Sequence, residues 1–174
     1  EKNLPVASGI GGGSADAAAA LRLLGGRRAD LPAIAAGLGA DVPACLASRA
    51  ARGEGRGDRL EPLAGEGLAG MPVLLVNPRV ALSTAAVFAA WDGIDRGPLV
   101  DWREGRNDLE APARQLVPEI GAVLDALADA DVARMSGSGA TCFGLYEDVA
   151  QRDAGQARML AEHPDWWTLA TRLK

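Results

Sequence analysis

The sequence has few of the residues on which disulfide scaffolds and histidine-based sites depend. It contains two cysteines, Cys45 and Cys142, and one histidine, His163, in 174 residues. A disulfide framework is therefore not expected. With one histidine, the chain also lacks the residues for a histidine-rich metal site, and a His-based catalytic triad is not favoured. Both cysteines lie within apolar runs, which predicts packing roles and a reducing, cytoplasmic location.

Long apolar runs and an excess of positive charge are also missing. No stretch reaches the roughly 18 uncharged apolar residues that a membrane-spanning helix needs. The formal net charge is −5, which argues against a nucleic-acid-binding surface. With 48% hydrophobic and 24% charged residues, the chain has the composition of a globular protein with a sizeable core. Its length predicts one domain or two small ones.

The beginning of the chain lacks an initiator methionine and a signal-type segment. It starts at Glu1, and a glycine-rich loop already lies within the first dozen residues. We therefore expect the chain to be incomplete at its N-terminus.

That glycine-rich loop leads into an alanine-rich helix. Residues 5–14 read PVASGIGGGS, and residues 15–24 are strong helix formers, with Ser14 as the predicted N-cap. Such a loop lets backbone N–H groups surround a phosphate, and a side chain at Gly12 is expected to obstruct it. The loop lacks the G-K-[ST] ending of a Walker A motif, and no buried strand precedes it as in a Rossmann motif. On the glycines alone, a flexible loop without a ligand is an equal alternative.

Two aspartates each precede a short, proline-containing helix. Asp30 is predicted to cap a helix that Gly39 ends, and Asp41 stands before a Val-Pro pair at the start of the next one. On the sequence alone, an N-cap role accounts for Asp41. The following residues 49–70 are rich in glycine, arginine and glutamate, which indicates a strand pair or a loop and a linker.

From Met71 onward, apolar strand candidates alternate with helices. The expected strands are residues 73–76, 132–135, 141–146 and 167–173, and the expected helices begin at Ser83, Pro118 and Asp148. This order of elements resembles a split βαβ, ferredoxin-like arrangement of the α+β class. Residues 136–139 then form a tight turn between two strands.

The motifs, taken together, resemble those of one superfamily. The loop P-x-x-x-G-I-G and its alanine-rich helix are similar to the phosphate-binding motif of the GHMP kinases, which include galacto-, homoserine, mevalonate and phosphomevalonate kinases. Four further stretches narrow the resemblance to the 4-diphosphocytidyl-2-C-methyl-D-erythritol kinase family. They are GADVP at 39–43, NPRVALST at 77–84, NDLE at 107–110 and RMSGSGATCF at 134–143.

The resemblance implies a GHMP kinase fold in two parts. Residues 1–70 would be the C-terminal part of the N-terminal, ATP-binding domain, which is an α/β domain of ribosomal-protein-like fold. Residues 71–174 would be the ferredoxin-like C-terminal domain. The family carries, ahead of the loop, a lysine that works with the catalytic aspartate and an aromatic residue and a histidine that bind cytosine. Lys2 does not match that lysine, so the 174-residue chain alone is expected to be inactive.

The resemblance also implies the site residues. ATP, with Mg²⁺, would be held by Pro5, Val6, Ala7, Ser8, Gly9, Ile10, Gly11, Gly12, Gly13, Ser14 and Ala15. Asp41 would be the catalytic base, and Thr84 and Phe88 would line the cytidyl pocket. No metal-ligating set of protein residues is expected. The resemblance further implies that residues 136–139 form a glycine-rich loop that lies against the nucleotide loop. The plainer alternatives are a helix cap for Asp41, a core position for Phe88 and a simple turn for residues 136–139.

The implied reaction is ATP-dependent phosphorylation of the 2-hydroxyl of 4-diphosphocytidyl-2-C-methyl-D-erythritol, a step of non-mevalonate isoprenoid synthesis. The expected partner is thus a small-molecule substrate, with neither nucleic acid nor membrane, and the oligomeric state stays open. Two rivals remain. One is another GHMP kinase, of homoserine or mevalonate type, and the other is a non-catalytic nucleotide-binding regulator of the same fold.

Overall fold

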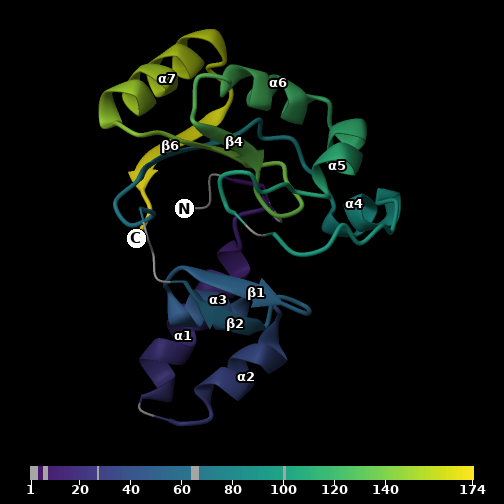
Figure 1. Ribbon diagram of the computed structural model, residues 1–174, viewed down its shortest axis with the longest axis vertical. Helices are drawn as coiled ribbons and strands as arrows, with labels where there is room; N and C mark the ends of the chain where they lie inside the picture. The colour runs from purple at the N-terminus through teal and green to yellow at the C-terminus, as the bar shows by residue number, and fades with distance from the viewer. Residues whose placement is uncertain (1–3, 6–7, 27, 64–66, 100) are drawn as a thin grey trace. The chain divides into compact units, whose positions relative to one another are not determined.

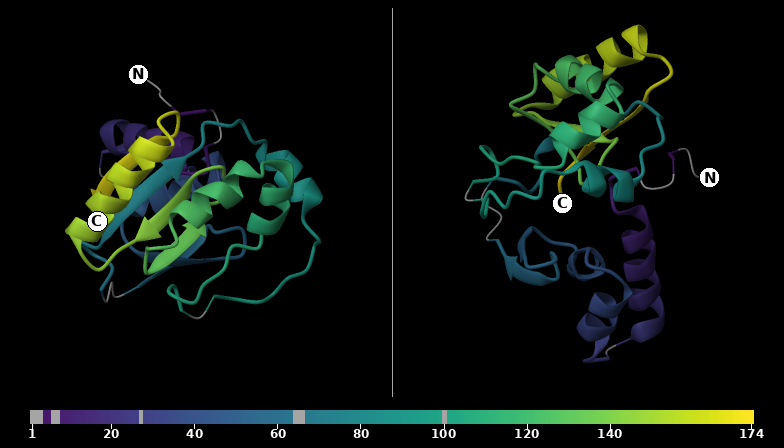
Figure 2. Two further views of the ribbon diagram at one scale, coloured as in Figure 1. Left: turned by 90° about the horizontal axis from the view of Figure 1, so that it is seen from above. Right: turned by 90° about the vertical axis from the view of Figure 1, so that its right-hand side faces the viewer.

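The computed structural model describes residues 4–5, 8–26, 28–63, 67–99 and 101–174. Contacts divide the chain into two compact units (Figures 1 and 2). We call residues 11–69 the helical unit, and residues 70–173 with those up to Ile10 the sheet unit. Residues 8–10 are thus grouped by their contacts with a part of the chain that begins 60 residues further on, at Gly70. None of the described helices is long and apolar enough to cross a membrane.

The sheet unit is built on four antiparallel strands. They are β3 (Pro72–Asn77), β4 (Val132–Met135), β5 (Cys142–Leu145) and β6 (Trp167–Arg172). Their order in the sheet is β4-β5-β3-β6, with β3 paired to both β5 and β6. The helices of this unit are α4 (Thr84–Ala90), α5 (Glu110–Leu116), α6 (Glu119–Ala126) and α7 (Val149–Glu162). This topology confirms the ferredoxin-like, α+β prediction.

Both faces of the central strand β3 are covered, which explains its unbroken apolar sequence. Leu74 and Val76 point to the face that α6 and α7 cover in Figures 1 and 2, where they join Ile120 and Met159 in the main core. The side chain of Val73 points the opposite way, as alternate residues of a strand do, and packs in a second cluster on the other face. A strand buried on both faces cannot show the polar alternation of a half-exposed one.

Side-chain caps set the ends of two of these helices, as predicted. The Ser83 hydroxyl accepts the N–H of Ala86 at 3.4 Å, and the Asp148 carboxylate accepts that of Gln151 at 2.8 Å. Helix α5 was not among the helices expected from the sequence. In the structure Pro112 lies in the first turn, where a proline is tolerated because its missing N–H needs no partner.

The helical unit contains three helices and a hairpin. They are α1 (Gly12–Gly25), α2 (Leu31–Leu38), α3 (Val42–Ala47), β1 (Ala51–Glu54) and β2 (Arg59–Pro62), and β1 pairs with β2. Of the two expectations for residues 49–70, a strand pair or a loop, the strand pair is confirmed. The prediction of Ser14 as N-cap is wrong. The N-cap is Gly11, which adopts a left-handed conformation with φ of 63°, so the helix starts at Gly12 and Ser14 lies within its first turn.

The helical unit has a much smaller core than the sheet unit. Its buried apolar residues form one cluster of Ala18, Ala35 and Val42, while Leu23 and Leu24 are 84% and 88% exposed. Because so little apolar area is buried there, local opening should cost less free energy than in the sheet.

We therefore expect amide hydrogen exchange in this chain to be slow mainly in the sheet unit. Amides of β3 and β5 should exchange much more slowly than those of α1 and α2. Mass spectrometry of peptic fragments measures this directly. Equal protection of α1 and β3 would show that the helical unit is stabilised by contacts beyond its own small core.

Candidate functional site

The first part of the glycine-rich loop is held against the turn between β4 and β5. The hydroxyl of Ser136 donates to the Gly9 carbonyl at 2.7 Å, and the Thr141 N–H donates to the Ser8 carbonyl at 3.2 Å. The Thr141 hydroxyl donates to the same Ser8 carbonyl. Residues 136–141 are thus more than a turn between strands, since they also fix the path of the loop. Among the predicted loop residues, Val6 and Ala7 lie outside the described residues.

Gly9 is the position in this loop where a side chain cannot fit. Its φ is +80°, and a Cβ built on it would lie 2.6 Å from the carbonyl oxygens of both Ser136 and Gly139. By contrast, a Cβ on Gly12 would meet nothing within 4 Å, and the φ of Gly12 is not positive. The steric constraint that the sequence suggested for Gly12 therefore falls on Gly9, where the backbone packs against backbone.

The second part of the loop becomes the first turn of α1. Gly11, Gly12 and Gly13 each leave open space where a side chain would stand. The N–H groups of a first helical turn have no partner within the helix, and the helix dipole favours negative charge there. Ser14 adds a half-buried hydroxyl to the same turn. Backbone and hydroxyl donors with open approach are what a phosphate group requires.

Asp41 occupies the N-cap position of α3, but its side chain does not act as a cap. Among the described residues, its carboxylate makes no capping hydrogen bond, and the side chain is exposed. The prediction of the position is confirmed, and a purely capping role for the carboxylate is wrong. Helix α3 packs on α1, where the Arg22 guanidinium donates to the Cys45 carbonyl at 2.8 Å and to that of Leu46 at 3.2 Å. The same unit therefore carries Asp41 and residues 11–15 of the loop.

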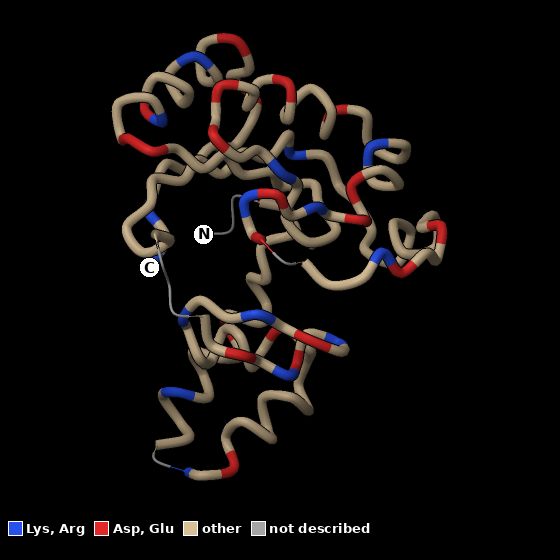
Figure 3. Tube along the Cα trace, viewed as in Figure 1, with Lys and Arg blue, Asp and Glu red and all other residues tan. Residues whose placement is uncertain are grey.

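Charged residues of both signs are interspersed in both units (Figure 3), and many form local pairs. Arg28 pairs with Asp30 at 2.6 Å and holds the pKa of that carboxyl below its usual value. Within the described part of the chain, Asp41 belongs to none of the ion pairs. Asp30 and Asp41 thus hold equivalent positions before their helices but differ in their partners, and only Asp41 keeps an unpaired carboxylate.

Thr84 and Phe88 lie one turn apart on α4. The Thr84 hydroxyl is 2.8 Å from that of Ser138, in the same turn that holds Ser8 and Gly9. Phe88 is 53% exposed, whereas its neighbour Val87 is fully buried in the main core. A core position for Phe88 is therefore wrong, and its ring is accessible for stacking.

The two cysteines are thiols without a catalytic environment. Burial raises the pKa of Cys142 to about 12, and burial together with the charge of Asp41 raises that of Cys45. A reactive cysteine needs a lowered pKa, so neither thiol has the environment of a nucleophile.

A magnesium ion is compatible with the residues present. Among the described residues, no group of three or more His, Cys, Asp or Glu could hold a metal. In kinases, however, Mg²⁺ takes its ligands from substrate phosphates and water with one or two protein oxygens. The hydroxyl of Ser14, on the first turn of α1, could supply one protein oxygen of this kind.

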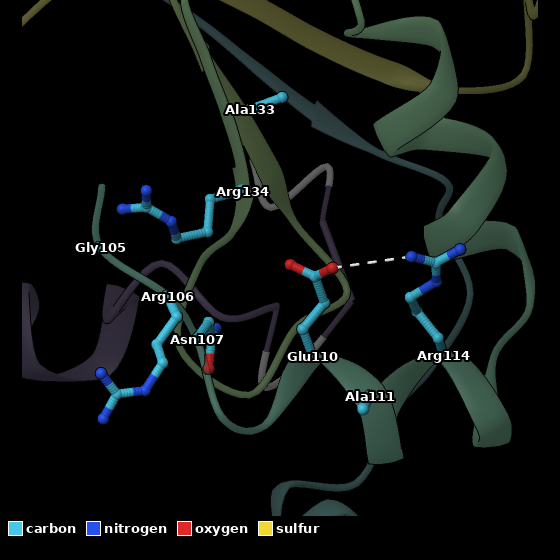
Figure 4. A pocket seen from close by; sticks show the side chains of 8 residues that line it. All are labelled: Gly105, Arg106, Asn107, Glu110, Ala111, Arg114, Ala133 and Arg134. Carbon is cyan, nitrogen blue, oxygen red and sulfur yellow. Dashed lines mark ion pairs between the residues drawn. The ribbon is translucent and has the colours of Figure 1, made fainter. Parts of the chain in front are cut away.

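A further pocket in the sheet unit contains none of the predicted site residues. Figure 4 shows Glu110 between Arg134 and Arg114, with Arg114 paired to Glu110 at 3.7 Å. Arg134 donates to the carbonyls of Trp102 and Arg103 at 3.1 and 3.2 Å, and burial lowers its pKa. Both guanidinium groups thus have partners within the protein, Arg114 in a carboxylate and Arg134 in two backbone carbonyls.

Comparisons with known proteins agree along the chain. Residues 93–165 match the family described as GHMP kinases C terminal. The chain is 58% identical to 4-diphosphocytidyl-2-C-methyl-D-erythritol kinase of Rhizorhabdus wittichii, covering 100% of this chain and 64% of that protein. It is 48% identical to the protein of that name from Erythrobacter litoralis, covering 100% and 69%.

A solved structure gives the same result. The crystal structure of a 4-(cytidine 5'-diphospho)-2C-methyl-D-erythritol kinase matches with a TM-score of 0.77 and 34% identity, over 98% of this chain and 68% of that one. The chain spans about two thirds of the length of these relatives. On this similarity, which covers its whole length, the chain belongs to the 4-diphosphocytidyl-2-C-methyl-D-erythritol kinase family of the GHMP kinases.

Proposed function

We propose that the protein transfers the γ-phosphoryl group of ATP to the 2-hydroxyl of 4-diphosphocytidyl-2-C-methyl-D-erythritol. The observation that carries this proposal is the 58% identity, along the whole chain, to a relative whose name states this substrate. The accessible loop at the start of α1, the unpaired Asp41 and the exposed Phe88 supply the groups that the reaction needs.

The loop residues bind the triphosphate. Backbone N–H groups of residues 8–14, which include the N-terminus of α1, donate to the phosphate oxygens, and the Ser14 hydroxyl reaches the same oxygens or Mg²⁺. The Ala15 N–H donates to the Gly11 carbonyl at 2.9 Å, so Ala15 helps to shape this turn without donating to the phosphates. The remaining predicted residues, Pro5, Val6 and Ala7, complete the binding loop in this proposal. Mg²⁺, when bound, neutralises charge on the phosphates. Phosphoryl transfer depends mostly on this positioning and charge neutralisation.

Asp41 acts on the acceptor hydroxyl. The oxygen of the 2-hydroxyl forms a bond to the γ-phosphorus as the bond from that phosphorus to the β,γ-bridging oxygen breaks, which releases ADP. The Asp41 carboxylate accepts the proton that the hydroxyl loses. Its exposure and its lack of an ion-pair partner among the described residues leave both carboxylate oxygens available to orient that hydroxyl.

Thr84 and Phe88 recognise the cytidyl group. The Phe88 ring stacks on the cytosine, and the Thr84 hydroxyl, oriented by Ser138, faces the same substrate. Residues 1–70 form the end of the ATP-binding domain and residues 71–174 the C-terminal domain. The protein acts in the cytoplasm on a small molecule, which agrees with its two unpaired thiols.

Replacing Phe88 by alanine is expected to raise KM for the cytidyl substrate by about 5-fold to 140-fold, because base stacking is worth roughly 1–3 kcal/mol. KM for ATP should change little. Since the ring is 53% exposed, the melting temperature should fall only slightly. Leu160→Ala is the matched control, because Leu160 is a 50% exposed apolar residue on α7. A large loss of stability without a selective rise in KM would support a packing role.

The substrate itself is tested by an acceptor panel. Turnover is measured in a protein of the relatives' length that contains this chain, with ATP and either the cytidyl ester, homoserine or mevalonate. We expect the cytidyl ester to have a far higher kcat/KM than the other two acceptors. Preference for homoserine or mevalonate would favour another GHMP kinase, and ATP binding without any turnover would favour a nucleotide-binding regulator.

A further inference from the structure

Two asparagine side chains hold the turn of residues 136–141, and sequence motifs alone assign neither of them a role. Asn107, just before α5, donates from its side-chain amide to the Met135 carbonyl at 2.8 Å and to that of Gly137 at 2.7 Å. Its side-chain oxygen accepts the N–H of Leu109 at 3.0 Å. One amide group therefore spans the end of β4 and the middle of the turn.

Asn77 holds the other end of the turn from within the core. It is fully buried at the end of β3, and its amide donates to the Thr141 hydroxyl at 2.8 Å. Its side-chain oxygen accepts the N–H of Arg79 at 2.7 Å. The Thr141 hydroxyl in turn donates to the Ser8 carbonyl. A buried polar side chain is costly unless it is bonded, so this chain of bonds gives Asn77 a definite connection to the loop.

The bonds to Ser8 and Gly9 determine where the loop directs its donors. Both carbonyls are bound by the turn, through Thr141 and Ser136. In a planar trans peptide the C=O and N–H groups point in opposite directions. Fixing the carbonyls of Ser8 and Gly9 on the turn therefore directs the N–H groups of Gly9 and Ile10 away from it.

We propose that Asn77 and Asn107 are positioning residues for the nucleotide. They fix residues 136–141, which orient the Gly9 and Ile10 N–H groups for the phosphates of ATP. The proposal rests on the proposed function only in naming ATP as the anion. It predicts that losing either amide loosens the loop and weakens ATP binding while the rest of the sheet unit stays folded.

The test uses serine at each position. In Asn107→Ser and Asn77→Ser, the short hydroxyl still accepts the N–H two residues ahead, as in an ST-turn, but cannot reach the turn. We expect Kd for MgATP, measured by calorimetry, to rise about tenfold, from the loss of one or two hydrogen bonds. KM for ATP should rise likewise. Hydrogen exchange at Gly9 and Ile10 should become faster without nucleotide.

Gln156→Ala is the matched control. It removes an amide-to-hydroxyl bond of 3.1 Å, to Thr168, in the same unit but away from the turn. Its ATP affinity and loop exchange should equal those of the wild type. If the asparagine variants melt at a much lower temperature than this control, the same binding and exchange measurements are made on Ser136→Ala. This variant removes the side-chain bond from the turn to the Gly9 carbonyl and so tests whether the turn orients the loop.

Unchanged exchange at Gly9 and Ile10, with Kd within about threefold of the wild type, would overturn the positioning role. Faster exchange and weaker MgATP binding in the variants would support it. Should the wild type bind MgATP but fail to phosphorylate the cytidyl ester, the proposed substrate would fall while the same comparison still decides the role of the asparagines.

Discussion

Replacing Asp41 by asparagine is expected to reduce turnover by about 10²–10⁴-fold, which is the usual contribution of a positioned general base. The substitution keeps the size of the side chain and removes the group that accepts the proton. Because the phosphates are held by the loop, Kd for MgATP should stay close to the wild-type value. Steady-state kinetics and calorimetry on the same protein separate the two effects.

Asp30→Asn is the control for this substitution. Asp30 also occupies the N-cap position of a helix with proline in its first turn, and its side chain likewise makes no capping bond. It differs in being paired with Arg28 and in lying before α2 rather than α3. Turnover of Asp30→Asn should match the wild type. If Asp41→Asn also keeps turnover within a few-fold, Asp41 only marks the start of α3.

Replacing Gly9 by alanine is expected to weaken MgATP binding by more than about tenfold. A left-handed φ costs an L-residue about 1–2 kcal/mol, and relieving the overlap of a Cβ with the Ser136 and Gly139 carbonyl oxygens costs more. The loop would have to leave the turn, and its N–H groups would lose their orientation. Calorimetric titration with MgATP measures the effect.

The control for Gly9 separates strain from contact. Gly93→Ala introduces a Cβ at a similar φ of +74°, with nothing within 4 Å. It should therefore lower stability slightly and leave ATP affinity unchanged. Equal ATP affinity in Gly9→Ala and the wild type would mean that the contact between the loop and residues 136–141 does not serve nucleotide binding.

Local signals made much of the fold predictable. The Ser83 and Asp148 caps and the apolar strand runs from Val73 onward predicted the ferredoxin-like unit. The errors came where glycine and proline permit more than one outcome. Gly11 takes the left-handed conformation and starts α1 earlier than Ser14 would, and helix α5, with Pro112 in its first turn, was not expected.

The candidate site was less predictable because its parts meet across long stretches of sequence. The contact of Gly9 with Ser136 joins residues 127 positions apart, and no local pattern indicates it. Phe88 and Val87 are adjacent apolar residues on one helix, and only packing decides that Val87 is buried and Phe88 exposed. Asn77 ends an apolar strand, where the sequence alone suggests no partner such as Thr141.

Phosphorus NMR of a complete reaction tests the proposed phosphoryl transfer most directly. The protein, at the length of its relatives, is incubated with MgATP and 4-diphosphocytidyl-2-C-methyl-D-erythritol, and all phosphorus-containing products are identified. We expect one ADP and one new phosphate monoester for each ATP consumed, with the monoester on the 2-oxygen of the cytidyl substrate. ADP and inorganic phosphate beside an unchanged cytidyl substrate would contradict the account.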